Sequence, residues 1–273
     1  MNSVNTNVGA MVALQNLNKT SSQLGEVQNR INTGLKVASA KDNGAVWAIA
    51  QNQRSNSGAL NAVKDSLQRS ISTVDVALSA GESISDTLLQ MKEKALAASD
   101  TTLDAASRTA LNDDFKALRD QLGKVVTNAV FNGANMIKAT TPTTVAALAS
   151  ADGVNKITVA AQNLSLGGGN ATVAATASIG TQTTAAAMIA TINTSIANVS
   201  SALSKLGTKA LSSHFSFVSK LQDTIDAGVG NLVDADLAKE SARLQSLQTK
   251  QQLGIQALSI ANSSSSSLLG LFR

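Results

Sequence analysis

The chain has 273 residues and a formal net charge of +4, from 22 basic and 18 acidic residues. Its hydrophobic content is 43%, supplied almost entirely by aliphatic side chains and alanine, while aromatic residues make up only 2%. Compact cores draw much of their buried area from aromatic side chains, so this composition favours long helical packing over a globule. With no cysteine and one histidine, disulfides are excluded and most metal-binding and nucleophilic chemistry lacks its usual residues.

The charges are scattered and are not accompanied by aromatic residues that would stack on bases. They indicate a solvated surface and not a nucleic-acid interface. The first residues lack the basic cluster and apolar run of a secretory signal, and no stretch reaches the roughly 18 to 20 apolar residues of a membrane span. We therefore expect no membrane insertion, and either a cytoplasmic protein or one exported without a cleaved signal peptide.

The first predicted helix has a narrow apolar seam. Its apolar residues follow the 3,4 spacing of a heptad, in a register that Ser21 and Gln28 complete. These residues are Leu14, Leu17, Leu24, Val27 and Ile31. The pair Thr33-Gly34 is predicted to end the helix, because glycine tolerates the left-handed conformation that follows a helix C-terminus. A polar connection at 39–44 follows.

The next two patterns predict long helices. An apolar stripe over 59–99 is far longer than the mean helix of about 12 residues. A second stripe covers 103–126, and the turn at 131–133 (FNG) is predicted to close it, because Asn-Gly is a strong turn signal.

The composition changes at about residue 139, where threonine and alanine begin to dominate. From there to residue 199 the chain has only two charged residues. Short apolar stretches at 157–166 and 171–175 predict a small hairpin with a loose turn at 167–170 (GGGN). A disordered segment is the alternative for this composition.

Helical periodicity returns over 188–225, and Gly228 and Gly230 are predicted to break it. A final helix is predicted after Asp234, which is a suitable N-cap residue. Its seam consists of Leu237, Leu244, Leu247, Leu258 and Ala261, with Glu240, Gln251 and Gly254 at the intervening heptad positions. The first and last seams are too narrow, and too diluted with polar residues and glycine, to hold an isolated helix. We expect the apolar tail, with Leu268 and Leu269, to be buried in an assembly.

These patterns together predict a mainly α fold. The N- and C-terminal segments form a long antiparallel helical hairpin or coiled-coil bundle, and a small β-hairpin region lies in the middle. The expected segments are an N-terminal assembly helix with its connection (1–44), two parts of a helical middle domain (45–138 and 185–230), a short variable surface segment (139–184), and a C-terminal assembly helix and tail (231–273).

Catalytic and metal-binding patterns are weak in this sequence. His214 stands alone within a helical pattern, beside Phe215 and Phe217, so a structural or exposed histidine is favoured over a catalytic one. The glycine triplet at 167–169 lacks the lysine and hydroxyl residue of a phosphate-binding loop. Acidic pairs such as Asp113-Asp114 are routine on solvated helix faces. We expect no enzyme activity, no cofactor and no metal.

Ordered motifs at both ends of the chain carry a family resemblance. At the N-terminal end they are 29–36 (NRINTGLK), 39–43 (SAKDN), 48–50 (AIA) and the turn at 131–133. At the C-terminal end they are 206–207 (LG), 233–241 (VDADLAKES) and 257–262 (ALSIAN). Over residues 1–138 and 190–273 the chain closely resembles bacterial flagellins, in a short form with a small variable region.

The resemblance implies a structural subunit that self-assembles into the flagellar filament, the helical propeller for swimming. It implies export of the unfolded chain by the flagellar type III system, and terminal segments that become helical on assembly and line the inner tube. The implied partners are further copies of the chain and related flagellins, the hook-filament junction and cap proteins, and the export machinery with its chaperone. The implied location is extracellular, in the filament.

The resemblance also bears on recognition by a vertebrate innate immune receptor. Flagellins that the receptor detects usually have arginine where this chain has Gln90, leucine where it has Lys94, and glutamate where it has Asp114. Glutamine cannot replace the bidentate guanidinium of arginine, so we expect poor activation of that receptor.

Three other readings compete with the filament subunit. A hook-filament junction protein or another flagellar axial protein would share these ends and occur in few copies. A metalloprotease inserted in the variable region requires an HExxH motif, and residues 139–184 contain no histidine. A soluble coiled-coil effector that uses the same export route would not self-assemble.

Overall fold

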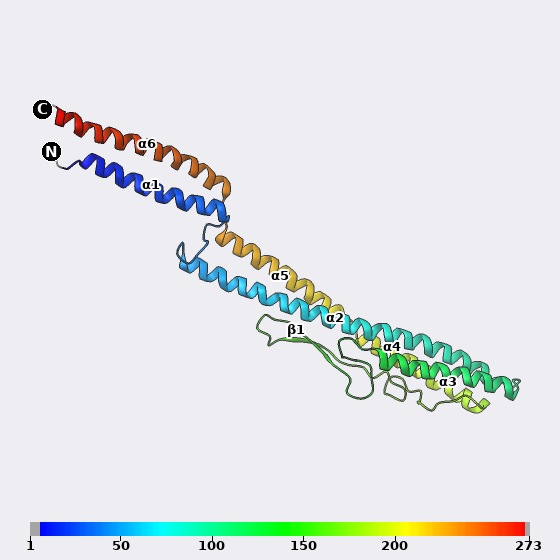
Figure 1. Cartoon of the computed structure of the whole chain (residues 1–273). Helices are drawn as coiled ribbons and strands as arrows, with labels where there is room; N and C mark the ends of the chain where they lie inside the picture. The colour runs from blue at the N-terminus through cyan, green and yellow to red at the C-terminus, as the bar shows by residue number, and fades with distance from the viewer. Residues whose placement is uncertain (1–5, 271–273) are drawn as a thin grey trace. The chain divides into compact units, whose positions relative to one another are not determined.

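The computed structural model describes the backbone of residues 6–270 and the side chains of residues 6–263. The helices are α1 (Val8–Thr33), α2 (Gly44–Ala98), α3 (Ala105–Asn128), α4 (Gln182–Lys205), α5 (Lys209–Val233) and α6 (Leu237–Gly270), and the strands are β1 (Val145–Leu148) and β2 (Lys156–Val159) (Figure 1). The predicted fold class, mainly helical with one small antiparallel hairpin, is confirmed.

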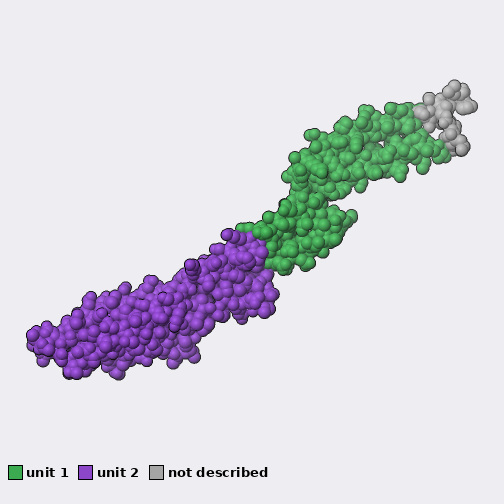
Figure 2. Space-filling model, turned by 180° about the vertical axis from the view of Figure 1, so that it is seen from behind, with its two compact units in different colours: residues 1–57, 223–273 green, residues 58–222 purple. Residues whose placement is uncertain are grey.

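The chain divides into two compact units, coloured separately in Figure 2. One unit is built from both ends of the chain, residues 1–57 and 223–273. The other is the middle of the chain, residues 58–222. The long helices α2 and α5 supply residues to both units.

In the unit built from both chain ends, α1 and α6 form the predicted antiparallel pair. At one end of the pair, the Asn7 side-chain amide donates to the Ala261 carbonyl at 2.8 Å. At the other end, Arg30 of α1 contacts Glu240 of α6. As predicted, α1 ends at Gly34, whose φ of 70° is the left-handed conformation that glycine adopts at low cost.

A small apolar cluster lies at the junction where the chain enters and leaves this helix pair. Its buried members are Val37, Ala50, Val229 and Val233, with Leu35, Val46, Trp47, Ile225 and Leu232 packed around them. Backbone hydrogen bonds join the two chain segments, because the amides of Lys36 and Val37 both donate to the Val233 carbonyl. The only tryptophan of the chain therefore packs where the N- and C-terminal segments meet.

In the middle unit, α2 supplies many of the fully buried side chains. Those on α2 include Leu67, Ile84, Leu88 and Met91, and Phe115 and Leu122 are buried on α3. Gly81 permits close helix approach here, because a Cβ at this position would lie 2.3 Å from Cδ2 of Leu203 on α4. Phe115 is the one aromatic side chain among the fully buried residues of this unit, in line with the low aromatic content of the sequence.

The predicted location of the hairpin is wrong. β1 pairs with β2 in the register Val145↔Val159, and the turn lies at 149–155 and not at 167–170. The physical reason is the Asp152-Gly153 pair: Gly153 has φ 73°, and Asp152 Oδ1 accepts hydrogen bonds from the Val154 amide and the Ser150 hydroxyl. Gly167 also has a positive φ, but it belongs to an irregular loop.

Several predicted helix boundaries also change. α2 begins at Gly44 and not near residue 59, because Oδ1 of Asn43 accepts from the Val46 amide of the first turn and Ala50 is buried in the junction cluster. α5 passes through Gly228 and Gly230 to Val233, and the break lies at 206–208. Burial of Val229 and Val233 in the junction cluster outweighs the helix cost of about 1 kcal/mol per glycine.

The start of the last helix is displaced by two residues from its predicted cap. Oδ1 of Asp236 accepts from the amides of Ala238 and Lys239, both at 3.1 Å. Asp234, the predicted N-cap, instead forms an isolated backbone bridge with Leu35. The cap is therefore Asp236, because Asp234 is held in the junction between α5 and α6.

Candidate assembly surface of the terminal helices

The seam predicted on the last helix matches the buried stripe of α6 closely. Leu247 and Glu240 are buried, and Leu244, Gln251, Gly254, Leu258 and Ala261 are half-buried. Leu237, at the start of the helix, is 49% exposed and does not belong to the buried stripe. The heptad spacing alone was therefore sufficient to find the inner face of this helix, apart from its first position.

On α1 the buried stripe differs from the predicted one. Leu17, Leu24, Val27 and Ile31 belong to it, but Leu14 is exposed. The remaining inner positions are Ala10, Ala13 and Thr20, which are half-buried. Both stripes satisfy 3,4 spacing, so the spacing could not choose between them. Leu14 thus lies outside the α1–α6 contact, and a role for it in contacts between subunits stays a prediction.

Small residues bring the two helices close together. A Cβ at Gly254 would lie 3.3 Å from Cδ1 of Leu17, and a Cβ at Gly9 would lie 3.8 Å from Cβ of Ala261. The seam is thus narrow because glycine and alanine occupy it. A narrow seam buries little apolar area per turn, which limits the stability of the helix pair by itself.

A charged group crosses the pair near its junction end. Arg30 donates to Glu26 on its own helix and to Oε1 of Glu240 at 3.3 Å. Glu240 is 8% exposed, and its Oε2 is buried without a hydrogen-bond partner in the described structure. Nearby, the amide and hydroxyl of Ser39 donate to the carboxylate of Asp42 and lower its pKa. Sequence spacing gave no sign of the Arg30–Glu240 contact, because the two residues are 210 positions apart.

Large apolar side chains also lie on the outer surface of both helices. On α1 they are Val8, Met11, Val12 and Leu14, and on α6 they are Leu237, Leu253, Ile255 and Ile260, each at least 48% exposed. Soluble monomers rarely leave so many large apolar residues on neighbouring turns in water. The side chains of Leu268 and Leu269, which were predicted to be buried in an assembly, lie outside the described residues.

Two family models match the chain. The model of the bacterial flagellin N-terminal helical region matches residues 4–141, and that of the bacterial flagellin C-terminal helical region matches residues 189–272. The chain belongs to the bacterial flagellin family.

Relatives of this flagellin match it from end to end. Flagellin FljM of Caulobacter vibrioides is 60% identical, with 100% of this chain and 99% of the relative covered. The flagellin of Brucella melitensis is 37% identical, with both chains fully covered. The crystal structure of Bacillus cereus flagellin covers 66% of this chain and 94% of its own at 18% identity, with a TM-score of 0.42.

This flagellin is therefore a structural subunit of the flagellar filament, which lies outside the cell and serves motility. Both of these full-length relatives are named flagellins, which favours the filament subunit over the hook-filament alternative. Self-polymerisation follows from membership of the family.

In the middle unit of this flagellin, two of the three positions considered for receptor contact touch each other. Nζ of Lys94 on α2 lies 2.6 Å from Oδ2 of Asp114 on α3, and both side chains are partly exposed. Gln90 is exposed on the same stretch of α2. The carboxylate of Asp114 is thus already paired within the chain.

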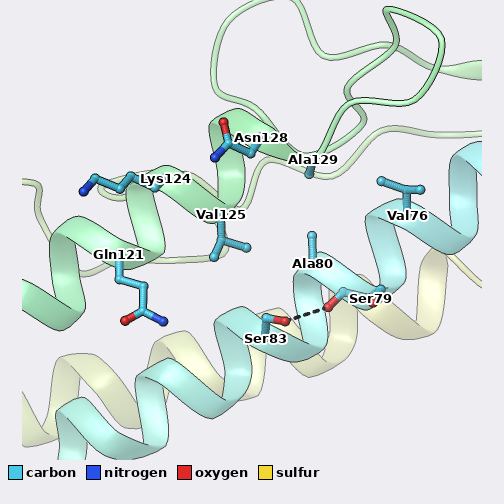
Figure 3. A pocket seen from close by; sticks show the side chains of 9 residues that line it. All are labelled: Val76, Ser79, Ala80, Ser83, Gln121, Lys124, Val125, Asn128 and Ala129. Atoms are coloured by element: carbon cyan, nitrogen blue, oxygen red, sulfur yellow. Dashed lines mark hydrogen bonds between the residues drawn. The ribbon is translucent and has the colours of Figure 1, made fainter.

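A shallow groove of about 420 Å³ lies between α2 and α3 in the same unit (Figure 3). Its lining residues are Val76, Ser79, Ala80, Ser83, Gln121, Lys124, Val125, Asn128 and Ala129. Lys124 is the only ionisable residue among them, and the Ser83 hydroxyl donates to the Ser79 carbonyl. This lining supplies no acid–base pair and no activated nucleophile.

The single histidine of the chain contacts the hairpin turn. Nε2 of His214 lies 2.8 Å from the Ala149 carbonyl, and its ring packs 5.7 Å from that of Phe217. His214 thus fixes the hairpin turn to α5. Among the residues that the structure describes, no three His, Asp or Glu side chains gather as metal ligands.

Proposed function

We propose that this flagellin polymerises through its terminal helices, which remain incomplete in the single chain. The observation that carries the proposal is the row of large exposed apolar side chains on the outer faces of α1 and α6. The narrow inner seam gives the pair little stability, so burial of the outer faces against neighbouring copies has to offset the entropy of ordering both helices.

The proposal assigns roles to the five segments predicted from the sequence. Residues 1–44 and 231–273, with Leu14, Leu237, Leu268 and Leu269 among their contact residues, form the inner tube of the filament. Residues 45–138 and 185–230 form the layer around it, and 139–184 carry the small surface projection. When one surface of a copy binds a different surface of the next copy, the contact repeats without closing and the result is an open helical polymer.

The further partners belong to the same proposal. We infer export of the unfolded chain by the flagellar type III machinery with its chaperone, without a cleaved signal peptide. The junction and cap proteins then form the two ends of the growing filament. The chain suits this route, because it has no cysteine and only one proline, so few slow covalent or isomerisation steps precede folding.

Catalysis and membrane insertion form no part of the proposed function. The groove between α2 and α3 lacks catalytic groups, and the family is structural. The stretch 182–233 is apolar and long enough to cross a membrane by length and composition alone. Its helix is interrupted at 206–208, and Ile192, Val199, Leu206, Leu211 and Val218 are buried within the chain.

Charged substitutions on the exposed apolar faces test the proposal. Met11→Asp and Ile260→Asp should each raise the critical concentration for seeded polymerisation by at least about tenfold, because a carboxylate would be desolvated at a subunit contact. The matched control is Val154→Asp, which changes the exposed valine of the hairpin turn and should leave the critical concentration unchanged. Equal polymerisation of all three variants would contradict the proposal.

We also propose that this flagellin activates the innate receptor poorly. Gln90 lacks the bidentate donors of arginine, and the Lys94–Asp114 ion pair occupies the carboxylate at the third position. The double substitution Gln90→Arg/Lys94→Leu should raise the signal in a reporter-cell assay, since it restores the arginine and releases Asp114. Strong activation by the unsubstituted protein would refute this.

A further inference from the structure

Arg30 and Glu240 form the one ion pair that the described structure places between α1 and α6. Its geometry is poor for a stabilising contact. The N–O distance is 3.3 Å, Arg30 is shared with the exposed Glu26, and Oε2 of the buried Glu240 has no partner. A buried carboxylate with one oxygen unsatisfied costs desolvation energy that a single long contact does not fully return.

The apolar seam between α1 and α6 does not by itself favour one alignment of the two helices strongly over others. Its inner positions recur every seven residues on both helices and are mostly small or aliphatic, as Leu17 against Gly254 illustrates. A shift by one heptad would again place inner positions opposite inner positions. Such a shift would, however, leave Glu240 buried without Arg30, and an unpaired buried charge is strongly unfavourable.

We propose that the Arg30–Glu240 pair sets the register of α1 against α6, at a cost to the stability of the pair. Arg30 and Glu240 are positioning residues: they exclude shifted alignments of the terminal helices. This inference rests on the proposed function, since the aligned pair is the unit that neighbouring copies bury in the filament. The junction backbone, where Leu35 bridges Asp234, is the competing determinant of register.

Because the chain has no cysteine, engineered cysteine pairs report the alignment without background. Gly9→Cys/Ala261→Cys reports the native register, since the Cβ positions are 3.8 Å apart, as a disulfide requires. Asn16→Cys/Ala261→Cys and Gly9→Cys/Gly254→Cys report shifts of one heptad in the two directions. Each reporter chain is polymerised in reductant and then oxidised, and the cross-linked fraction is measured by gel electrophoresis.

The test compares three versions of each reporter chain: unchanged, Arg30→Met/Glu240→Leu, and Glu26→Gln. Glu26→Gln is the matched control, because it removes the exposed carboxylate from the same guanidinium. The ratio of native to shifted cross-linking should fall at least about tenfold in the apolar double variant and stay unchanged in the control. The critical concentration should rise more for Arg30→Met alone, which leaves Glu240 buried without its partner, than for the apolar double variant.

An unchanged cross-linking ratio in the apolar double variant would overturn the proposal and assign the register to the junction backbone. Failure of that variant to polymerise would also overturn it, since the pair would then be needed for stability. Absence of the native cross-link in otherwise unchanged filaments would refute the aligned pair itself. The proposed function fails separately, if the chain with native Arg30 and Glu240 forms no filaments from seeds.

Discussion

At the residue scale, small side chains decide how closely the helices approach. Gly81 on α2 is the sharpest case, because Cδ2 of Leu203 occupies the space where its Cβ would be. Gly254 on α6 is milder, because a Cβ there would lie 3.3 Å from Cδ1 of Leu17, against 2.3 Å from Cδ2 of Leu203 at Gly81. The glycines in these long helices therefore serve different purposes, and only some of them tolerate alanine.

Gly81→Ala is expected to destabilise the middle unit in spite of alanine's higher helix propensity. Overpacking costs typically about 1–3 kcal/mol, against about 1 kcal/mol gained from propensity. In a Leu203→Ala background the clash disappears, so the same substitution should become stabilising. Thermal denaturation of the four proteins measures this coupling, and a coupling energy near zero would show that Leu203 is not the obstacle.

At the element scale, the ends of the helices are set by local hydrogen bonds that sequence patterns locate only approximately. Gly34 ends α1 as predicted, because its left-handed conformation has a clear residue signature. The start of α6 was misplaced, because both Asp234 and Asp236 are suitable N-cap residues. The hairpin was misplaced because the glycine triplet at 167–169 is the more conspicuous turn pattern in the sequence, whereas the turn that forms is closed by the carboxylate of Asp152.

The two candidate caps of α6 are separable by substitution. Asp236→Ala should remove about 1 kcal/mol from the stability of α6, because its carboxylate accepts from two amides of the first turn. Asp234→Ala should have a smaller effect, since the bridge that Asp234 makes with Leu35 uses backbone atoms. The helical content of assembled filaments on mild heating distinguishes the two. A larger loss of helical content in Asp234→Ala than in Asp236→Ala would show that Asp234 is the cap.

The inner stripes of α1 and α6 could be predicted from the sequence only in part. On α6 the heptad positions from Leu244 to Ala261 were found from spacing alone. On α1 the spacing fitted two overlapping stripes, and the choice between Leu14 and Ala13 depends on where α6 packs. The Arg30–Glu240 contact could not be predicted, because it joins residues that only the folded pair brings together.

At the scale of the whole molecule, the mainly helical fold and the flagellin family were readable from the two ends of the chain. What the sequence could not locate was the place where the chain divides into a unit made from both termini and a unit made from the middle, because this boundary lies inside α2 and α5. That division depends on contacts between residues more than 200 positions apart in the sequence, such as Asn7 and Ala261. The unit of the two termini carries the apolar faces that further copies must cover, and this is the central claim.

Seeded polymerisation of the intact flagellin beside a chain truncated after Val233 tests that claim most directly. Electron microscopy of both proteins, at equal concentration and with the same filament seeds, gives the readout. Without α6, the inner seam of α1 has no partner and half of the outer apolar face is lost. The account predicts long filaments from the intact chain and none from the truncated one. Filaments of equal length from both would contradict it.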